Sequence, residues 1–238
     1  MIFNKLITHP EEVVQKVLDS IERQEQLLLT YLNQHCFNIY ANDNEYRNLI
    51  DNQFISYQAD LGMFLALKYV YGKKLIKIDA TAMNQVILKE LIEKKIPLSI
   101  VGGNFDTKFV LDKCNQENIN LVTYHNGYFE ENQSENIIKN LNDSKYQVFI
   151  IGMGVPQQEL FAKKLSLNMN NKVIICVGNF LEFYFSTKSR APVFIQKIGL
   201  EWMFRMLTEP LRLWKRYLIG IPFFIYRIIK IKFTGINS

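Results

Sequence analysis

Asp60 is the carboxylate in this sequence that is best placed for proton transfer, because it directly follows an apolar segment, residues 54–59, typical of a buried strand. A carboxylate in that position can act as a general base that takes a proton from an attacking hydroxyl group. The same side chain could instead cap a helix that begins near Leu61. Three further polar side chains follow the first expected strand at the same level of the sheet: Asn33, His35 and Asn38. They are candidates for substrate binding, although a lone histidine is more often a hydrogen-bonded structural residue.

Glycine-containing turns follow three other expected strands, at residues 101–104, 151–156 and 177–179. Glycine lets the backbone approach a ligand closely, and the helix after such a turn offers free amide groups and a positive dipole end to a phosphate. The glycines that we expect to contact a ligand are Gly102, Gly103, Gly152 and Gly154. Tight strand-to-helix packing also uses glycine, so each turn alone has two explanations.

The second of these turns carries helix-start signals as well. Pro156 stands where a helix can begin, and Gln157, Gln158 and Glu159 would form its first turn. Gln158 would place an amide at the mouth of the sheet, where it could bond a sugar hydroxyl or a base edge. Glu159 could contribute to the same site or only complement the helix dipole.

The remaining pattern indicates how these groups would meet. Six apolar segments are typical of strands: residues 27–32, 54–59, 97–102, 119–124, 147–152 and 172–178. Seven segments have helical spacing: residues 11–25, 39–50, 61–71, 81–94, 105–117, 134–143 and 157–169. Continuous apolar strands are typical of a parallel sheet that is covered on both faces. The sequence therefore predicts an α/β fold with a doubly wound, mostly parallel sheet, in which ligands bind at the carboxyl ends of the strands.

The chain changes character near residue 190, so we expect an α/β domain over residues 1–189 and a helical appendage over residues 190–238. The appendage has nine Lys and Arg residues against Glu201 and Glu209, a net charge of +7, whereas residues 1–189 carry −2. Its basic residues alternate with Trp, Phe and Ile, as in a helix that lies in a membrane interface. A basic helix docked on its own domain is the main alternative. Nucleic-acid binding is disfavoured, because no recognised reader motif accompanies the charge.

Composition sets further limits. The 238 residues include 48% hydrophobic and 21% charged side chains, an ordinary globular composition that excludes a mini-protein and a disordered chain. The three cysteines, Cys36, Cys114 and Cys176, lack metal-ligand spacing and fit buried free thiols in a reducing compartment. Polar residues near the N-terminus argue against a signal peptide, and the ten-residue apolar stretch 217–226 is too short to span a bilayer. We therefore expect an intracellular protein.

Together these residues resemble the WecG/TagA/CpsF family of bacterial glycosyltransferases, glycosyltransferase family 26. The similar motifs follow one another in the family's order along most of the chain, which makes the whole set specific. They are Asn33-Gln34-His35-Cys36-Phe37-Asn38, Asp60 after a strand, Gly127-Tyr128-Phe129, Gly152-Met153-Gly154-Val155-Pro156-Gln157-Gln158-Glu159, Arg190-Ala191-Pro192, Gly199-Leu200-Glu201-Trp202, and Arg205 with Glu209-Pro210, Arg212, Lys215, Arg216 and Tyr217.

The resemblance implies a Rossmann-like fold of the GT-E type and an inverting transfer that needs no metal and no cofactor. The sugar would be an N-acetylhexosamine or a related one, the donor a UDP-sugar and the acceptor a polyprenyl-diphosphate-linked sugar. The product would enter a cell-surface polysaccharide or teichoic acid. The enzyme would be cytoplasmic and peripheral on the inner face of the cell membrane.

The resemblance also implies roles for individual residues. Asp60 would be the catalytic base, and Asn38 and Gln158 would hold the donor or acceptor sugar. The glycine loops, with Gly127 among them, would surround UDP. The arginines that match the family's are Arg190, Arg205, Arg212 and Arg216. Of these, Arg212 and Arg216 match the arginines of an appendage that, in the family, closes over the site and helps to meet the diphosphate at the membrane. Without a metal, guanidinium groups and amide dipoles must stabilise the departing UDP.

Several positions depart from the family's pattern. Cys36 stands where the family usually has Thr, and Asp60-Leu61-Gly62 replaces a contiguous Asp-Gly. In the counterpart of R-x-x-G-x-D, the changed residues are Lys77, Ala80 and Ala82. A lysine cannot reproduce a bidentate arginine contact, so these changes bear on the identity of the acceptor.

The departures leave open a different class of function, a non-catalytic subunit that binds a nucleotide-sugar or lipid for another transferase. A nucleotide-dependent oxidoreductase is rejected, because residues 27–38 contain no glycine where its phosphate-binding turn would be. The oligomeric state stays open, and a homo-oligomer is compatible with the apolar faces near the tail.

Overall fold

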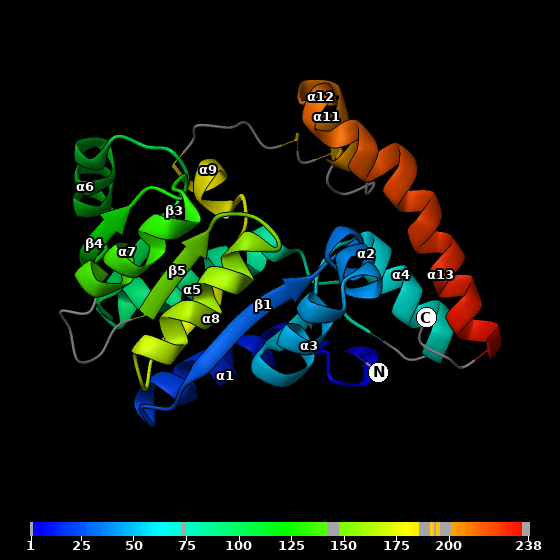
Figure 1. The fold of residues 1–238 in the computed structure, drawn as a ribbon, viewed down its shortest axis with the longest axis horizontal. Helices are drawn as coiled ribbons and strands as arrows, with labels where there is room; N and C mark the ends of the chain where they lie inside the picture. The colour runs from blue at the N-terminus through cyan, green and yellow to red at the C-terminus, as the bar shows by residue number, and fades with distance from the viewer. Residues whose placement is uncertain are drawn as a thin grey trace.

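The computed structural model describes residues 2–72, 75–141, 148–185, 191–192, 194–195 and 201–234. In these ranges six strands form one sheet with the order β2-β1-β6-β5-β3-β4. The strands are β1 (Leu27–Leu32), β2 (Ile55–Gln58), β3 (Leu98–Gly102), β4 (Leu121–His125), β5 (Val148–Gly152) and β6 (Val173–Cys176). Every pairing is parallel, so the predicted sheet is confirmed (Figure 1).

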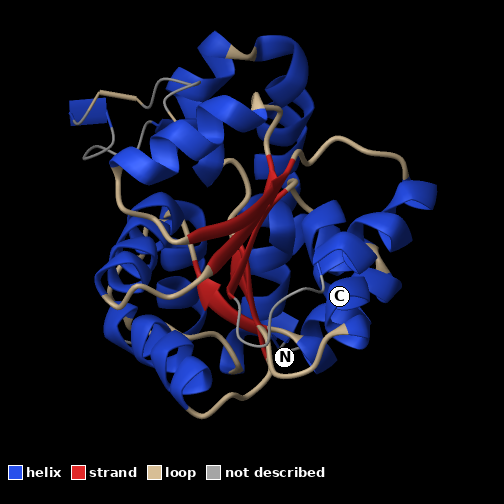
Figure 2. Cartoon of the chain, turned by 90° about the vertical axis from the view of Figure 1, so that its left-hand side faces the viewer, coloured by secondary structure: helices blue, strands red, loops and turns tan. Residues whose placement is uncertain are grey.

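Helices cover both faces of this sheet (Figure 2). They are α1 (Pro10–Glu22), α2 (Gln34–Asn42), α3 (Asn44–Gln53), α4 (Leu61–Tyr71), α5 (Ala80–Glu93), α6 (Thr107–Gln116), α7 (Ser134–Leu141), α8 (Gln157–Asn168) and α9 (Phe180–Tyr184). Strand β5 shows the two-sided burial directly. Val148 and Ile150 join the hydrophobic cluster that includes α5 and α6, whereas Phe149 and Ile151 join the cluster that includes α7 and α8. Because successive strand residues point to opposite faces, the two clusters lie on the two sides of the sheet.

The segment after β1 differs from the prediction. One helix was expected over residues 39–50, but the chain forms α2 and α3. Asp43 separates them, since its extended backbone ends α2 and its carboxylate accepts from the amides of Glu45 and Tyr46 as the N-cap of α3. The other predicted elements agree with the observed ones to within one helical turn, and the end of the predicted helix 134–143 lies outside the described residues.

The sheet has a topological switch point between β3 and β5. The connection from β3 runs through α6 to β4, and that from β5 runs through α8 to β6, so the two leave in opposite directions. They also use opposite faces, because α6 and α8 belong to different hydrophobic clusters. In open α/β sheets, ligands bind at such a switch point, at the carboxyl ends of the strands.

Glycines in the loops at this switch point allow the loops to touch. A Cβ atom on Gly102 would lie 2.6 Å from the Gly152 carbonyl oxygen, and one on Gly127 would lie 2.8 Å from the Gly102 Cα. The loops are also joined by hydrogen bonds, from the Gly103 amide to the Gly152 carbonyl (3.2 Å) and from the Gly127 amide to the Gly103 carbonyl (2.8 Å). Close packing of backbone therefore explains Gly102, Gly127 and Gly152.

The chain after residue 200 forms a helical extension that we call the C-terminal arm, residues 201–234. It contains α11 (Glu201–Thr208), α12 (Pro210–Trp214), the π-helical turn η3 (Lys215–Ile219) and α13 (Gly220–Thr234). Figure 1 shows the arm in orange and red beyond the carboxyl ends of the strands, with α13 running beside α2 and α4. None of the helices in the described ranges has the length and apolar character needed to cross a membrane.

One stripe of the arm is docked on the sheet domain. Phe224, Ile228 and Ile231 of α13 are buried and belong to the main hydrophobic cluster. The Phe224 ring meets the Phe37 ring of α2 edge to face, with 5.6 Å between the ring centroids. The expected alternative of a basic helix docked on its own domain thus describes this stripe, while other apolar residues of the arm, such as Leu211 and Phe233, are exposed.

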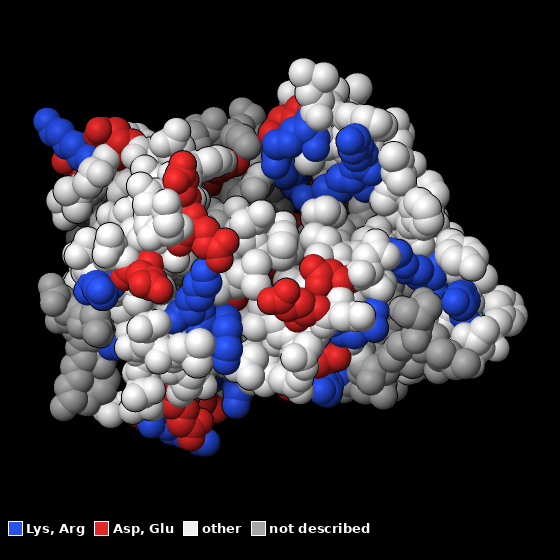
Figure 3. Space-filling view, viewed as in Figure 1, with Lys and Arg blue, Asp and Glu red and all other residues white. Residues whose placement is uncertain are grey.

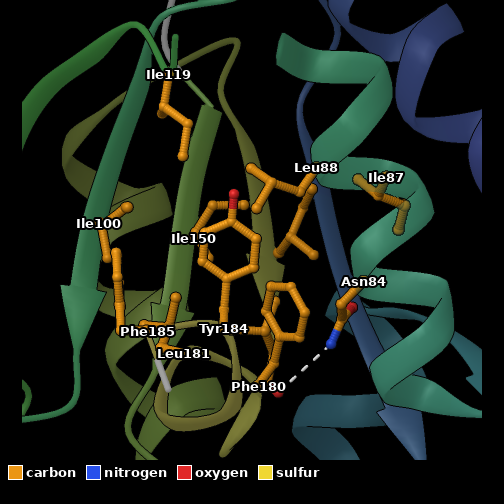
Figure 4. Close-up of a pocket in the computed structure, with 12 residues that line it drawn as sticks. Asn84, Ile87, Leu88, Ile100, Ile119, Ile150, Phe180, Leu181, Tyr184 and Phe185 are labelled. Atoms are coloured by element: carbon orange, nitrogen blue, oxygen red, sulfur yellow. Dashed lines mark hydrogen bonds between the residues drawn. The ribbon is translucent and has the colours of Figure 1, made fainter. Parts of the chain in front are cut away.

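The core also contains a small cavity of about 10 Å³ between α5, α9 and the sheet (Figure 4). Apart from Asn84, its lining is mostly apolar. The Asn84 amide donates to the Val177 carbonyl (3.4 Å) and accepts from the Tyr57 hydroxyl (3.3 Å). A void of this size holds at most one water molecule, so it belongs to core packing.

The contact between Gly102 and Gly152 leads to a stability prediction. Gly102→Ala should lower the free energy of unfolding by about 3 kcal/mol, since the added methyl group meets backbone that cannot rotate away. Gly72→Ala is the matched control: its φ of +64° is strained for alanine, but its Cβ would meet nothing within 4 Å, so about 1 kcal/mol is expected. Denaturant unfolding monitored by circular dichroism measures both. Equal losses in the two variants would contradict the close-packing explanation.

Candidate active site

A cavity of about 680 Å³ lies between the carboxyl edge of the sheet at β1 and β2 and the C-terminal arm. In Figure 3 the surface is hollowed between the sheet domain and the arm, and blue Lys and Arg atoms lie on the arm side of the hollow. The polar part of the lining includes Asn33, Asp60, Lys77, Asp79, Arg205 and Arg216. The apolar part is formed by α4 and α13 and includes Leu65, Tyr69, Ile221, Ile225 and Ile229. The cavity is therefore amphipathic: acidic and basic side chains line one part of it, and aliphatic and aromatic side chains line the other.

Asp60 contributes the carboxylate that backbone amides hold at the cavity wall. Its Oδ1 accepts from the Met63 amide (2.8 Å) and its Oδ2 from the Gln34 amide (3.2 Å). The first bond caps α4, so the capping role and the place at the cavity, which the sequence left as alternatives, coexist in one side chain. These bonds fix the carboxylate at the positive end of the α4 dipole.

The backbone and the ionisation of Asp60 are both unusual. Its φ of 86° and ψ of 165° lie in a region that is essentially restricted to glycine and costs about 1–3 kcal/mol. Burial raises the pKa of the Asp60 carboxyl to about 6, although the Met63 and Gln34 amides and the charge of Arg216 oppose the rise. A partly buried carboxylate with a pKa near the working pH suits a general base.

Arg205 and Arg216 bring guanidinium groups from the arm to the same cavity. The Nε atoms of both are shielded from solvent and make no hydrogen bond to any residue in the described ranges. An unpaired buried donor is costly, and an anionic oxygen would satisfy it. Burial and the nearby charge of Arg216 lower the pKa of His35 to about 4, so this imidazole is neutral at physiological pH.

Other expected site residues lie outside this cavity lining. Arg212 is exposed and forms an ion pair with Glu209 of the arm, with 2.6 Å between Nη2 and Oε2. His35 is partly buried in α2, and Asn38 uses its side chain to bind the arm. Arg190 lies outside the described residues.

Gln158 and Glu159 are fully buried beneath the glycine turns. The Gln158 oxygen accepts from the Gly178 amide (2.9 Å), and its nitrogen donates to Glu159 Oε1 (2.8 Å). The Thr30 hydroxyl donates to the same oxygen at 2.7 Å. In this arrangement the Gln158 side chain links the turn after β6 to Glu159.

Gly154 is different from the packed glycines: its φ is 83° and a Cβ there would meet nothing within 4 Å, so its backbone faces open space.

The departures from the family's pattern fall into two groups. Cys36 is fully buried, and burial raises the pKa of its thiol to about 12, so it does not present a reactive group to the cavity. Lys77 and Ala80, by contrast, line the cavity near Asp60. Ala82 is not among the lining residues, and its amide donates to the Asp79 carboxylate that caps α5. Of these departures, those at positions 77 and 80 are the ones that line the cavity.

Sequence reasoning did not identify the apolar part of the cavity. Leu65 and Tyr69 lie one turn apart on α4, and both are about half exposed although Met63, Ala66 and Leu67 of the same helix are buried. A helix that is apolar on all sides needs a second apolar neighbour. The apolar sequence of α4 was therefore the signal that could have predicted the apolar part of the cavity. The second apolar wall of the cavity is α13, which comes from the far end of the chain.

In the described ranges no three His, Cys, Asp or Glu side chains gather as metal ligands would.

The chain matches the model of a known protein family. The model of the Glycosyl transferase WecG/TagA/CpsF family matches residues 3–238, which is almost the whole chain.

The buried position of Glu159 predicts a pH dependence of stability. Burial raises the pKa of Glu159 to about 7, so the folded state binds a proton more tightly than the unfolded state. Its stabilising effect is therefore complete below the ordinary glutamate pKa and is lost as the pH rises through about 7. Between pH 5 and pH 8 the wild type should lose about 2 kcal/mol of unfolding free energy relative to Glu159→Gln. Denaturant unfolding across this range measures the difference, with the exposed Glu135→Gln as control. A constant difference would show that Glu159 is ionised throughout.

Proposed function

The chain belongs to the WecG/TagA/CpsF family of glycosyl transferases, and from that premise we propose that it transfers a sugar from UDP to a polyprenyl-diphosphate-linked acceptor with inversion. Membership of this family indicates a glycosyltransferase of cell-surface polysaccharide synthesis. It also indicates the classes of the two substrates, a nucleotide-sugar donor and a lipid-linked acceptor. Our proposal adds the identity of the nucleotide, the nature of the lipid and the residues that act.

In the proposed reaction, Asp60 takes the proton from the acceptor hydroxyl as that oxygen attacks the anomeric carbon. The new glycosidic C–O bond forms on the face opposite the bond to the diphosphate, which breaks with its electron pair moving to UDP. One proton passes to Asp60 and one negative charge develops on the leaving group. The amides that hold Asp60 also orient it, so little reorganisation is needed in the transition state.

The observation that supports this proposal best concerns two guanidinium nitrogen atoms in the cavity that Asp60 also lines. Arg205 Nε and Arg216 Nε are both buried and lack a hydrogen-bond acceptor among the described residues. A diphosphate supplies such acceptors, and the charge that develops on departing UDP would strengthen both bonds. A catalytic site gains rate from interactions that are stronger in the transition state than in the ground state.

The amphipathic cavity fits a lipid-linked acceptor. The apolar walls from α4 and α13 would accept the first isoprenoid units, while the polar part near Asp60 would accept the diphosphate and sugar. Ile225 and Ile229 line the cavity and are also about half exposed, so its apolar part opens toward the outer surface of α13. A lipid could therefore enter from a membrane against which the arm lies.

The outer surface of the arm has the composition of a membrane interface. Leu211, Leu218 and Phe233 are 94%, 60% and 79% exposed. Basic residues are interleaved with them, including Lys215 and Lys230. Exposed apolar side chains with flanking positive charge bind anionic lipid surfaces. We propose that this surface holds the enzyme on the inner face of the cell membrane.

Replacing the proposed base tests the chemistry. Asp60→Asn keeps the size of the side chain but cannot accept the proton, so turnover should fall at least about 100-fold while UDP binding is retained. The assay is UDP release with a panel of UDP-N-acetylhexosamines and a short-chain polyprenyl-diphosphate sugar. Asp43→Asn is the matched control, since Asp43 also caps a helix but lies outside the cavity. Near-normal turnover of Asp60→Asn would remove Asp60 from the mechanism. Absence of UDP release by the wild type across the panel would favour the non-catalytic alternative.

Replacing the exposed apolar residues tests the membrane surface. The combined variant Leu211→Ser, Leu218→Ser and Phe233→Ser should bind anionic phospholipid vesicles about 100-fold more weakly, because three apolar side chains no longer leave water. Cosedimentation with vesicles at low and high salt measures the effect, and added salt should weaken wild-type binding further. Leu167→Ser, 69% exposed on α8, is the control. Unchanged vesicle binding of the triple variant would contradict a membrane role for this surface.

A further inference from the structure

Asn38 connects the sheet domain to the C-terminal arm through both ends of its side-chain amide. Its Nδ2 donates to the Gly220 carbonyl oxygen at 2.7 Å. Its Oδ1 accepts from one nitrogen of the Arg227 guanidinium, and the second nitrogen of that guanidinium donates to Asn42 Oδ1. Asn38 and Asn42 are one turn apart on α2, so Arg227 spans two acceptors on one helix face.

These bonds lie directly beside the turn that carries a cavity arginine. Gly220 follows the π-helical turn η3, in which Arg216 lines the cavity and Tyr217 is buried. A π-helical turn is rare and occurs often at functional sites. Fixing the carbonyl of Gly220 therefore fixes the end of the turn that presents Arg216.

Apolar packing alone would not set the position of the arm along α2. The buried residues of α13, Phe224, Ile228 and Ile231, repeat at intervals of four and three. A slide of the helix by one turn, about 5.4 Å, would again bring apolar residues against the same surface, because hydrophobic contact is non-directional. Hydrogen bonds from Asn38 are directional and are satisfied in one register only.

We infer that Asn38 is a positioning residue, which sets the register of the C-terminal arm on α2 and thereby the distance of Arg205 and Arg216 from Asp60. The claim about the register rests on the hydrogen bonds that Asn38 makes to the arm. The claim about its effect on catalysis rests, in addition, on the proposed function. This role differs from direct sugar binding, which the family resemblance suggested for Asn38. A residue that binds sugar acts on substrate affinity, whereas a residue that sets the register acts on the arm even without substrate.

Hydrogen–deuterium exchange of the full-length protein without substrate tests the register. In Asn38→Ala, amides in residues 210–234 should exchange about tenfold faster, because the bonds to Gly220 and Arg227 are lost. Exchange in β3, β5 and α8, and the midpoint of denaturant unfolding, should stay as in the wild type. Asn168→Ala is the matched control, since Asn168 is exposed at the end of α8 and bonds only within that helix. Unchanged exchange in the arm of Asn38→Ala would overturn the inference.

Arg227→Met provides an independent variant on the arm itself. It keeps an unbranched apolar stem while removing the guanidinium, and it should reproduce the faster exchange even if Asn38→Ala does not fold. In the double variant, the factor by which amide exchange in the arm is accelerated should be smaller than the product of the factors of the two single variants. The reason is that both substitutions remove the same bond between Asn38 and Arg227. Fully multiplicative effects would contradict a link between Asn38 and Arg227.

Kinetics separate this inference from the proposed function. If both hold, Asn38→Ala should lower kcat about tenfold or more and leave the KM for the UDP-sugar within twofold. A raised KM with normal arm exchange would instead identify Asn38 as a sugar-binding residue. Absence of transferase activity in the wild type would defeat the proposed function, while the exchange measurements would still decide whether Asn38 sets the register.

Discussion

The proposed transfer reaction depends on a single constraint: a carboxylate must be kept poorly solvated and yet ready to ionise. Asp60 meets this constraint through backbone amides, which stabilise the charged form while the surroundings oppose it. The strained backbone of Asp60 is the cost of turning β2 sharply into α4 with the carboxylate at the start of the helix. The sheet positions this turn beside the end of β1, where Gln34 supplies the second amide.

The C-terminal arm completes the site from the other side. The apolar residues of α13 have three settings. Phe224 and Ile228 pack on the sheet domain and also line the cavity, Ile225 and Ile229 line the cavity and are about half exposed, and Phe223 and Phe233 are exposed. Under the proposed function, one helix would bind its own domain, a lipid acceptor and a membrane surface at once. The same arm carries Arg205 and Arg216, which line the cavity with Asp60, and the charge of Arg216 acts on the Asp60 carboxyl from the docked arm. Membrane attachment and assembly of the active site, as we propose them, would both depend on the C-terminal arm.

The sheet could be predicted from the sequence chiefly because strands such as β5 and β6 contain continuous apolar runs, which are typical of a parallel sheet that is covered on both faces. The division between α2 and α3 was missed, since Asp43 ends one helix and caps the next within a pattern whose apolar spacing hardly changes. The motifs identified Asp60, Arg205 and Arg216 as site residues, and all three line one cavity. The packed role of Gly102 and the buried bonds of Gln158 depend on neighbours from distant loops. The apolar wall of the cavity depends on contact between α4 and α13, which no local pattern specifies.

The pH dependence of kcat/KM for sugar transfer tests the central claim most directly, because this quantity reports the ionisation of the free enzyme. The account predicts an acidic limb with an apparent pKa near 6, below which Asp60 is protonated and transfer falls tenfold per pH unit. The limb should be absent from the residual activity of an enzyme that lacks this carboxylate. A wild-type profile that stays flat down to pH 4 would contradict a desolvated carboxylate as the base.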